Sequence, residues 1–559
     1  MQMLLRCFVP ALLAAATAAQ GDGEPSFTRS FGEAGAPGSM RARFVRAGAG
    51  LAWLQLSDHA RSVDRPAAGS RPEDNHLLLV WNGNDHALRL AHAASPAPAL
   101  FPVEPAEATW TVADGGSELT FTLDGGQGLE LEKKLRYDAR QRGFVLELAL
   151  RNKTANAAGS LDLVLGGPMP VSPAESSLFG TLAVAIAAAA DGTLATVPPK
   201  AGPPQPLAVD PAQMAFAGST NRFFAAFLWP LDDSSRAALG PLQVDAVPLR
   251  DDPDSLTHAF TSTRVRYPVK LEIPAQNGET RLRYGLYFGP KSYRVFATLP
   301  EPERFAPVLE HDLNAPCCVI EVPGGRPMAK LLLWLMGIFH DVVGNWGIAI
   351  IMLTILVRGL LAPLNFKMQK SMRAYGARMA VLKPKMEALK KQHGDDQRAY
   401  QQAMIAFQRE HKLMPPLGGC LPIFLTMPIY IGLFTALRTA YDLRHQPFAS
   451  WIDDLSRPDG LFALGFWPHQ FNLLPILWIA LMVVQTLRTP LPTDPQQRQQ
   501  MMIMRYMPLI FGVMLYYYAA GLLVYMVTSM LWSMVEYSVT QKILGPVDPN
   551  IAGTTPQMI

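Results

Sequence analysis

The sequence predicts an exported all-β sandwich domain, followed by an all-α polytopic membrane core of five transmembrane helices with a cytoplasmic helical hairpin. Three observations lead to this fold class. The long apolar runs are concentrated in residues 328–544, whereas residues 25–325 have the composition of a soluble domain. Apolar and polar residues alternate along much of that first part, and a strongly basic segment separates the first two apolar runs of the second part.

Residues 1–20 resemble a secretory signal peptide. They carry one basic residue, Arg6, then an apolar stretch, and then Ala16-Thr17-Ala18, which fits a cleavage site of the A-x-A kind. The alternative is an N-terminal anchor that is retained in the membrane. In either case residues 25–325 are expected outside the cytoplasm.

Residues 21–325 are expected to form the periplasmic β-sandwich. Apolar residues recur at every second position in several short segments, which are separated by turns rich in Gly, Asp and Asn. The clearest examples are Leu119, Phe121 and Leu123; Leu146, Leu148 and Leu150; Val265, Tyr267, Val269 and Leu271; and Leu282, Tyr284 and Leu286.

Neither a catalytic constellation nor a metal-ligand pattern is visible in this domain. Its histidines are scattered without ligand spacing, and the four cysteines of the chain match neither a disulfide framework nor a metal site. The sequence therefore predicts a protein that is not an enzyme and has no cofactor and no metal.

The membrane core is expected over residues 326–545, with a short non-basic tail at 546–559. Residues 328–341 read as an amphipathic helix at the membrane interface. The continuous apolar stretch from Met507 to Val539 is too long for one untilted span, so either one tilted helix or two short helices that meet near Gly521 are expected. With two helices, the predicted spans are about 343–364, 417–437, 471–487, 507–520 and 522–539.

The basic segment at 367–412 fixes the predicted orientation. It contains eleven Lys and Arg residues against four acidic residues, which places it in the cytoplasm by the positive-inside rule. Residues 25–325 and 438–470 then lie outside. Apolar residues at alternating spacings of three and four on both sides of residues 393–396 predict an antiparallel coiled-coil hairpin, and Pro384 is expected to kink or interrupt its first arm. Its basic positions include Lys383, Lys385, Lys390 and Lys391.

Arg358 is the most informative residue of the membrane core. It is the only ionisable residue in the apolar run 347–364, and a charge near the middle of a bilayer costs about 2.5–3.5 kcal/mol on insertion scales. Such a residue faces either a partner or a water-filled cavity, and is a candidate functional residue. The alternative is an arginine that extends to the headgroups from near a helix end.

Several motifs in residues 328–544 resemble the YidC-type membrane protein insertases. Over residues 25–325 the resemblance is weaker. The motifs that carry it, in chain order, are Gly344-Asn345-Trp346-Gly347, Val357-Arg358-Gly359, Pro384-Lys385, Gly394-Asp395-Asp396, Pro416-Leu417-Gly418-Gly419-Cys420-Leu421-Pro422, Met427-Pro428-Ile429, Pro447-Phe448-Ala449, Thr493-Asp494-Pro495, Met507-Pro508 and Gly521-Leu522.

The resemblance implies a membrane protein insertase and chaperone of the bacterial inner membrane, which inserts nascent membrane proteins alone or with the Sec translocon. It implies a hydrophilic groove in which Arg358 receives polar or acidic parts of the client. Nascent membrane proteins, the lipid bilayer, the ribosome and the Sec translocon are the implied partners, with no nucleic acid as a specific ligand. Matching polar positions add five groove candidates, each of which has a helix-to-helix or backbone hydrogen bond as its alternative: Thr354, Thr426, Gln485, Tyr525 and Ser529.

The sequence departs from the pattern of the YidC-type insertases in two places. Tyr525-Met526 stands where many relatives have two tyrosines, and the tail after Lys542 lacks the basic residues that many relatives carry.

A transporter or channel with an intramembrane anion site is the alternative function, and it predicts further intramembrane charges. An envelope enzyme acting through its β-domain is a third hypothesis, which the scattered histidines disfavour.

Overall fold

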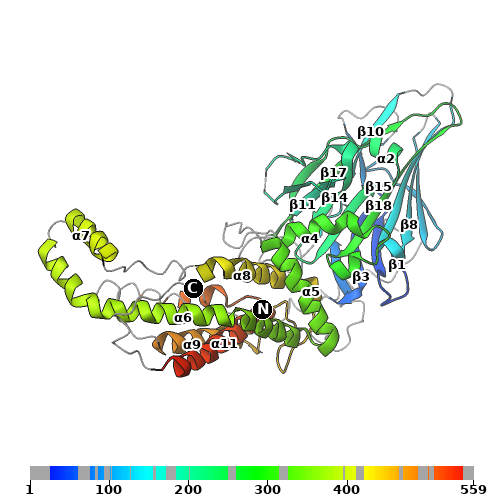
Figure 1. Cartoon of the computed structure of the whole chain (residues 1–559). Coiled ribbons are helices and arrows are strands. Elements are labelled where there is room, and N and C mark those ends of the chain that lie inside the picture. Colours follow the sequence, from blue (N-terminus) through cyan, green and yellow to red (C-terminus); the bar gives the residue numbers. More distant parts are fainter. Residues whose placement is uncertain are drawn as a thin grey trace. The chain divides into compact units, whose positions relative to one another are not determined.

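A computed structural model describes the chain in two compact units, Met1–Ala315 and Pro316–Ile559 (Figure 1). The described residues are 26–60, 76–81, 86–93, 101, 103–125, 128–154, 159–170, 184–200, 202–249, 260–313, 325–393, 397–410, 421–464, 470–488, 502, 506, 509–510 and 512–545. The predicted signal peptide, the turn at 394–396 and the tail at 546–559 lie outside these residues.

The described part of the first unit is β-rich, with strands in three antiparallel sheets. The four-stranded sheet has the order β1 (Ser26–Phe31), β2 (Met40–Val45), β3 (Gly50–Ala60), β4 (His76–Trp81). The five-stranded sheet has the order β13 (Gln205–Pro206), β16 (Gln243–Leu249), β17 (Phe260–Glu272), β10 (Ser160–Gly166), β5 (Leu90–His92). The nine-stranded sheet has the order β12 (Leu194–Val197), β11 (Val184–Ala189), β14 (Met214–Thr220), β15 (Phe224–Pro230), β18 (Glu279–Pro290), β9 (Gly143–Asn152), β8 (Leu129–Asp138), β7 (Glu118–Asp124), β6 (Thr111–Asp114).

The alternating segments of the sequence form strands whose apolar residues are buried. In β7, for example, Leu119, Phe121 and Leu123 are buried while the intervening threonines are only partly covered. The sheets are also joined by polar contacts across the core. The hydroxyl of Tyr267 on β17 donates to the carbonyl of Ala217 on β14 at 2.8 Å, which satisfies a buried polar group between two sheets.

Short helices accompany the sheets, so the prediction of an all-β domain was wrong in this detail. They are α2 (Asp233–Ala237), α3 (Tyr293–Phe296) and α4 (Ala306–Leu313), with 3-10 turns at Ala139–Gln141, Pro211–Gln213 and Pro302–Phe305. Phe305 and Val308 pack into an aromatic cluster with Phe227 of β15. The buried ion pair of Lys291 with Asp312, at 2.6 Å, ties α4 to the end of β18. These helices are too short for the apolar residues in their sequence to show a clear helical period.

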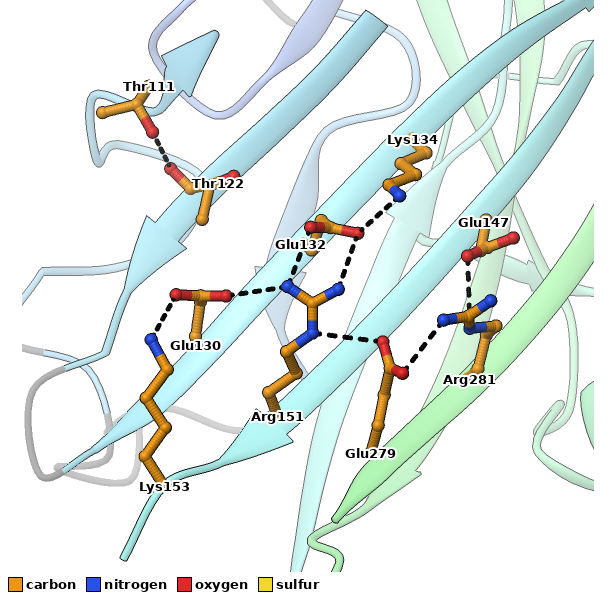
Figure 2. A network of polar contacts seen from close by, with 10 residues as sticks. All are labelled: Thr111, Thr122, Glu130, Glu132, Lys134, Glu147, Arg151, Lys153, Glu279 and Arg281. Atoms are coloured by element: carbon orange, nitrogen blue, oxygen red, sulfur yellow. Dashed lines mark hydrogen bonds and ion pairs between the residues drawn. The ribbon is translucent and has the colours of Figure 1, made fainter. Parts of the chain in front are cut away.

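One face of the nine-stranded sheet carries a continuous network of charged side chains (Figure 2). Arg151 on β9 lies directly between Glu130 of β8 and Glu279 of β18 in the strand register, and contacts their carboxylates at 3.0 and 3.3 Å. Further pairs extend the network to Glu132, Lys134, Glu147, Lys153 and Arg281. Four acidic and four basic residues balance one another in it, as is typical of a solvated sheet face.

The described part of the second unit is mainly helical (Figure 1). Two short strands, β19 (Phe462–Ala463) and β20 (Gln470–Phe471), and a 3-10 turn at Tyr441–Leu443 lie between its apolar helices. Helix α11 packs against α6, α8 and α9, and α5 packs against α6 and α8. The helices are α5 (Gly325–Val343), α6 (Trp346–His393), α7 (Gln397–Glu410), α8 (Leu421–Thr439), α9 (Leu473–Arg488) and α11 (Ala520–Leu544).

Helix α6 runs without interruption through the predicted first span and the first arm of the predicted hairpin (Figure 1). Both Pro363 and Pro384 lie inside it, so Pro384 does not interrupt the helix, and the other expected outcome, a kink at Pro384, stays a prediction. Each proline removes only one backbone hydrogen bond, and the turns on either side preserve the helix. Helix α7 follows residues 394–396 and contacts α6, with Phe407 buried and Ile405 exposed.

Two of the described helical stretches, Trp346–Ser371 and Ala520–Leu544, are long and apolar enough to cross a membrane. Helix α9 is apolar but shorter. A turn at residues 515–518 separates helical residues 512–514 from α11, so the chain changes direction a few residues before Gly521. Within the described residues, the helix is therefore interrupted at 515–518 and not continuous into α11.

The loop between α8 and α9 is held by buried polar side chains at the ends of the helices. The carboxylate of Asp459 accepts hydrogen bonds from the amides of Leu473 and Leu474, which begin α9, at 2.8 and 3.1 Å. The carbonyl of Leu455 accepts from the amide of Gly521, at the start of α11, at 2.8 Å. The loop thus satisfies amide groups that have no partner within their own helices.

Candidate functional site

The candidate site lies between facing stripes of α6 and α11. On α11, Tyr525, Ser529, Trp532 and Glu536 follow one another at spacings of four, three and four, and therefore share one face. On α6, Thr354, Arg358 and Asn365 share a face in the same way.

The opposite faces of these two helices are apolar and exposed. They carry Leu356 and Leu360 on α6, and Leu531 and Val535 on α11. Each helix thus directs polar groups toward the other and apolar groups away, which is the arrangement expected of polar residues inside a membrane bundle.

Arg358 is held by neutral partners. Its Nε donates a hydrogen bond to Oγ of Ser529 at 3.1 Å. Its guanidinium carbon lies 5.4 Å from the ring centroid of Tyr430 on α8, within the range of a cation–π contact. In the described part of the structure no carboxylate lies within ion-pair distance of Arg358, so its positive charge is not neutralised by a fixed acid.

Three polar contacts connect α6 to α11 along the length of the interface. Below the Arg358–Ser529 contact, Nδ2 of Asn365 lies 3.5 Å from Oε2 of Glu536. Arg373 then donates to Oε1 of Gln541 at 2.6 Å and to the carbonyl of Gly545 at 3.1 Å, where α11 ends. The residue numbers increase together on both helices, so α6 and α11 run parallel and the contacts follow at intervals of about two turns.

The other residues proposed from the sequence occupy different positions. The hydroxyl of Thr354 is buried and donates to the carbonyl of Ile350 at 2.7 Å, which is the backbone hydrogen bond considered as its alternative. Tyr525 is buried, and its ring lies 6.5 Å from that of Tyr430. Gln485 is half-buried on α9, and the described contacts of Arg358 do not include it. The side chain of Thr426 lies outside the described residues.

Asn365, Tyr430 and Trp532 are among the residues around Arg358 that the sequence-based candidates did not include. Tyr430 stands four residues after Thr426, so it shares that residue's helix face and supplies the α8 contact to Arg358. The helical spacing from Arg358 to Asn365, and from Ser529 to Trp532, was the available signal for the other two. Their roles could not be recognised until the pairing of α6 with α11 was known.

The basic residues of the predicted hairpin lie on α6 beyond the apolar stretch. Lys385 and Lys391 are exposed, and the side chains of Lys383 and Lys390 lie outside the described residues. Within the described ranges, no group of three or more His, Cys, Asp or Glu side chains is arranged to hold a metal ion.

Comparison with known proteins relates the helical unit to one family. Residues 338–545 match the family described as "60Kd inner membrane protein". The "Membrane protein insertase YidC" of Neisseria gonorrhoeae is 41% identical over 309 residues, and that of Neisseria meningitidis serogroup C is 35% identical over 310 residues. Each alignment covers 55% of this chain and 49% of the relative, so the chain spans about half the length of the curated relatives it matches.

A solved structure described as an active YidC insertase with its first transmembrane domain resolved is 18% identical to this chain. The similarity covers 96% of this chain and 99% of that one, with a TM-score of 0.33, which is too low to carry an argument. The sequence matches carry the likeness: residues 338–545 match the family described as "60Kd inner membrane protein", and this part of the chain is similar to the YidC membrane protein insertases.

Proposed function

We propose that this chain is a membrane protein insertase and chaperone of the bacterial inner membrane. In this proposal its second unit crosses the membrane five times and encloses a hydrophilic groove, and its β-rich unit lies in the periplasm. The clients are nascent membrane proteins. The ribosome and the Sec translocon are proposed partners, with the exposed Lys385 and Lys391 available to a cytoplasmic partner.

The observation that carries the proposal is the state of Arg358. Arg358 lies within the helical stretch Trp346–Ser371, which is long and apolar enough to cross a membrane, with six residues of the apolar run 347–364 still to follow it. Its partners are a hydroxyl and an aromatic ring, so its charge remains available to a carboxylate. A fixed cation in a low-dielectric groove attracts acidic residues of a translocating segment more strongly than it would in water.

Partition of the apolar part of the client into lipid then drives insertion. Burial of apolar surface is favourable by about 25 cal/mol per Å², so a transmembrane segment needs no nucleotide hydrolysis to leave the groove sideways. The residues proposed to form the groove are Arg358, Thr354, Thr426, Gln485, Tyr525 and Ser529, together with Tyr430, whose ring contacts Arg358. Thr354 contributes through its hydroxyl, which bonds to the carbonyl of Ile350 in its own helix, one turn before Arg358.

Reconstitution tests this function directly. The purified chain in lipid vesicles should protect the translocated tail of a single-span client from added protease, at a rate well above that of protein-free vesicles. A client that is not inserted faster with the chain than without it would contradict the proposal. Flux of small anions through the same vesicles would instead favour the transporter or channel.

A further inference from the structure

Glu536 is a carboxylate on α11 that makes no direct ion pair among the described residues, although the charge of Arg358 acts on it at longer range. The side chain is half-buried, and its Oε1 is shielded from solvent without any hydrogen-bond partner among the described residues. Its Oε2 has only the amide of Asn365, at 3.5 Å, which is at the outer limit of a hydrogen bond. A carboxylate in such surroundings is poorly satisfied and gains from a cation that can reach it.

The two nearest arginines along the interface are engaged elsewhere. Arg358 lies seven positions before Asn365 on α6, about 10 Å along the helix axis, and donates to Ser529. Arg373 donates to Gln541 and to the carbonyl of Gly545 at the end of α11. The structure thus keeps an acid and a base about two turns apart in one interface, where their charges attract each other but make no direct ion pair.

Trp532 supports the view that this stretch of α11 is open to a ligand. Its Nε1 is also buried without a hydrogen-bond partner among the described residues. It stands four positions before Glu536 and therefore on the same face. The indole N–H of Trp532 needs an acceptor and the carboxylate of Glu536 needs a donor. A peptide bound along this helix face supplies both kinds of group.

We propose that Glu536 is a second charged position of the groove, which binds a lysine or arginine on the cytoplasmic flank of a client's transmembrane segment. This inference rests on the proposed insertase function. Arg358 receives an acidic residue of the part to be translocated, and Glu536 holds a basic residue about 10 Å nearer the cytoplasm. Membrane proteins carry an excess of Lys and Arg on their cytoplasmic flanks, so the two positions together recognise the orientation of the client.

The test compares two model clients in vesicles of phosphatidylethanolamine and phosphatidylglycerol that contain the full chain. Both clients are single apolar spans with one Asp in the translocated tail, and they differ only in Lys or Gln at the cytoplasmic flank. Protease protection of the tail gives the insertion rate of each. The ratio of the Lys rate to the Gln rate should fall about fivefold in Glu536→Gln, the size expected for loss of one partly exposed ion pair.

Two further variants sharpen the result. Glu410→Gln, which removes an exposed acid on α7, should leave the ratio at the wild-type value. Glu536→Lys should reverse the preference toward a client with Glu at the flank. A purely structural role for Glu536 would slow both clients equally, and an unchanged ratio in Glu536→Gln therefore overturns the inference. If the wild-type chain inserts neither client above protein-free vesicles, the insertase function itself fails, and the inference falls with it.

Discussion

At the scale of single residues, the environment of Arg358 decides how its charge is used. A salt bridge to an acid on the same bundle would have made it a structural residue, whereas Ser529 and Tyr430 hold the guanidinium without cancelling its charge. Neutral hydrogen-bonding and aromatic partners lower the cost of a cation in an apolar bundle. Arg358 is therefore positioned and still available to a carboxylate.

Lys133 is a second charged residue in an unusual environment, in the β-rich unit. It is fully buried on β8, and its Nζ donates to the carbonyl of Ala49 at 2.6 Å and to the carbonyl of Leu88. Burial lowers its pKa from 10.5 to about 7. The neutral amine has two N–H bonds, which is enough for both carbonyls, so the uncharged form suits this position.

The stability of the protein should therefore depend on pH through Lys133. Between pH 7 and 10 the unfolded chain binds a proton at this residue that the folded chain has released, so Lys133 makes the free energy of unfolding rise with pH, by up to about 1.4 kcal/mol per pH unit. Lys133→Met should be less stable, because two buried carbonyls lose their donor, and its stability should rise less steeply over this range. Denaturant unfolding of both proteins at pH 7, 8 and 9 measures the two slopes. Equal slopes would show that the lysine is not neutralised by burial.

At the scale of elements, the start of α6 shows how one sequence motif fixes a helix. Gly344 has a φ of +67° at the end of α5, and the side-chain oxygen of Asn345 accepts from the amide of Ile348 in the first turn of α6. His340 stacks on Trp346 with 4.1 Å between ring centroids. A Cβ on Gly347 would lie only 2.1 Å from the ring of Phe448, so the loop between α8 and α9 approaches α6 at a position that only glycine allows.

Gly347→Ala should therefore destabilise the helical unit by about 1–3 kcal/mol, the usual cost of overpacking a filled site. Gly359→Ala is the matched control, because it lies in the same helix and its added methyl group would meet nothing within 4 Å. That control should be neutral or slightly stabilising, since alanine favours helix more than glycine does. Thermal unfolding in detergent compares the two variants with the wild type. Equal stability of Gly347→Ala and Gly359→Ala would contradict the close approach of Phe448.

The elements were predictable where one kind of pattern dominated the sequence. Period-2 alternation located β7, β9, β17 and β18, apolar length located α8, α9, α11 and the first part of α6, and spacings of three and four located α7. The sequence left open whether Pro384 kinks or interrupts the helix, because whether a helix ends at a proline depends on the stability of the turns around it. The polar partners of Arg358 could be foreseen only in part. Helical spacing shows which residues share a face, but the sequence does not say which faces meet.

At the scale of the whole molecule, the account depends on orientation across the membrane. The basic segment 367–412 and the loop between α8 and α9 are placed on opposite sides by the positive-inside rule.

Two cysteine substitutions test the orientation in intact cells. Lys391→Cys, at an exposed position of α6, should be shielded from a membrane-impermeant thiol reagent added outside. Ala463→Cys, at an exposed position of the loop between α8 and α9, should react with the same reagent. Each variant is compared with its labelling after the membrane is permeabilised. The opposite pattern would invert the topology and move the β-rich unit to the cytoplasm.

The most direct measurement of the central claim is client insertion and thermal stability on the same Arg358 variants, in vesicles and in detergent respectively. Arg358→Lys should retain much of the insertion activity, because attraction of a carboxylate needs a cation more than a planar fork. Arg358→Ala should slow insertion of clients with acidic translocated tails by about tenfold or more while its melting temperature stays near that of the wild type, because Arg358 makes no direct ion pair whose loss would leave a buried acid unpaired. Unimpaired insertion of every such client by Arg358→Ala, or a loss of activity that only follows a loss of stability, would contradict the account.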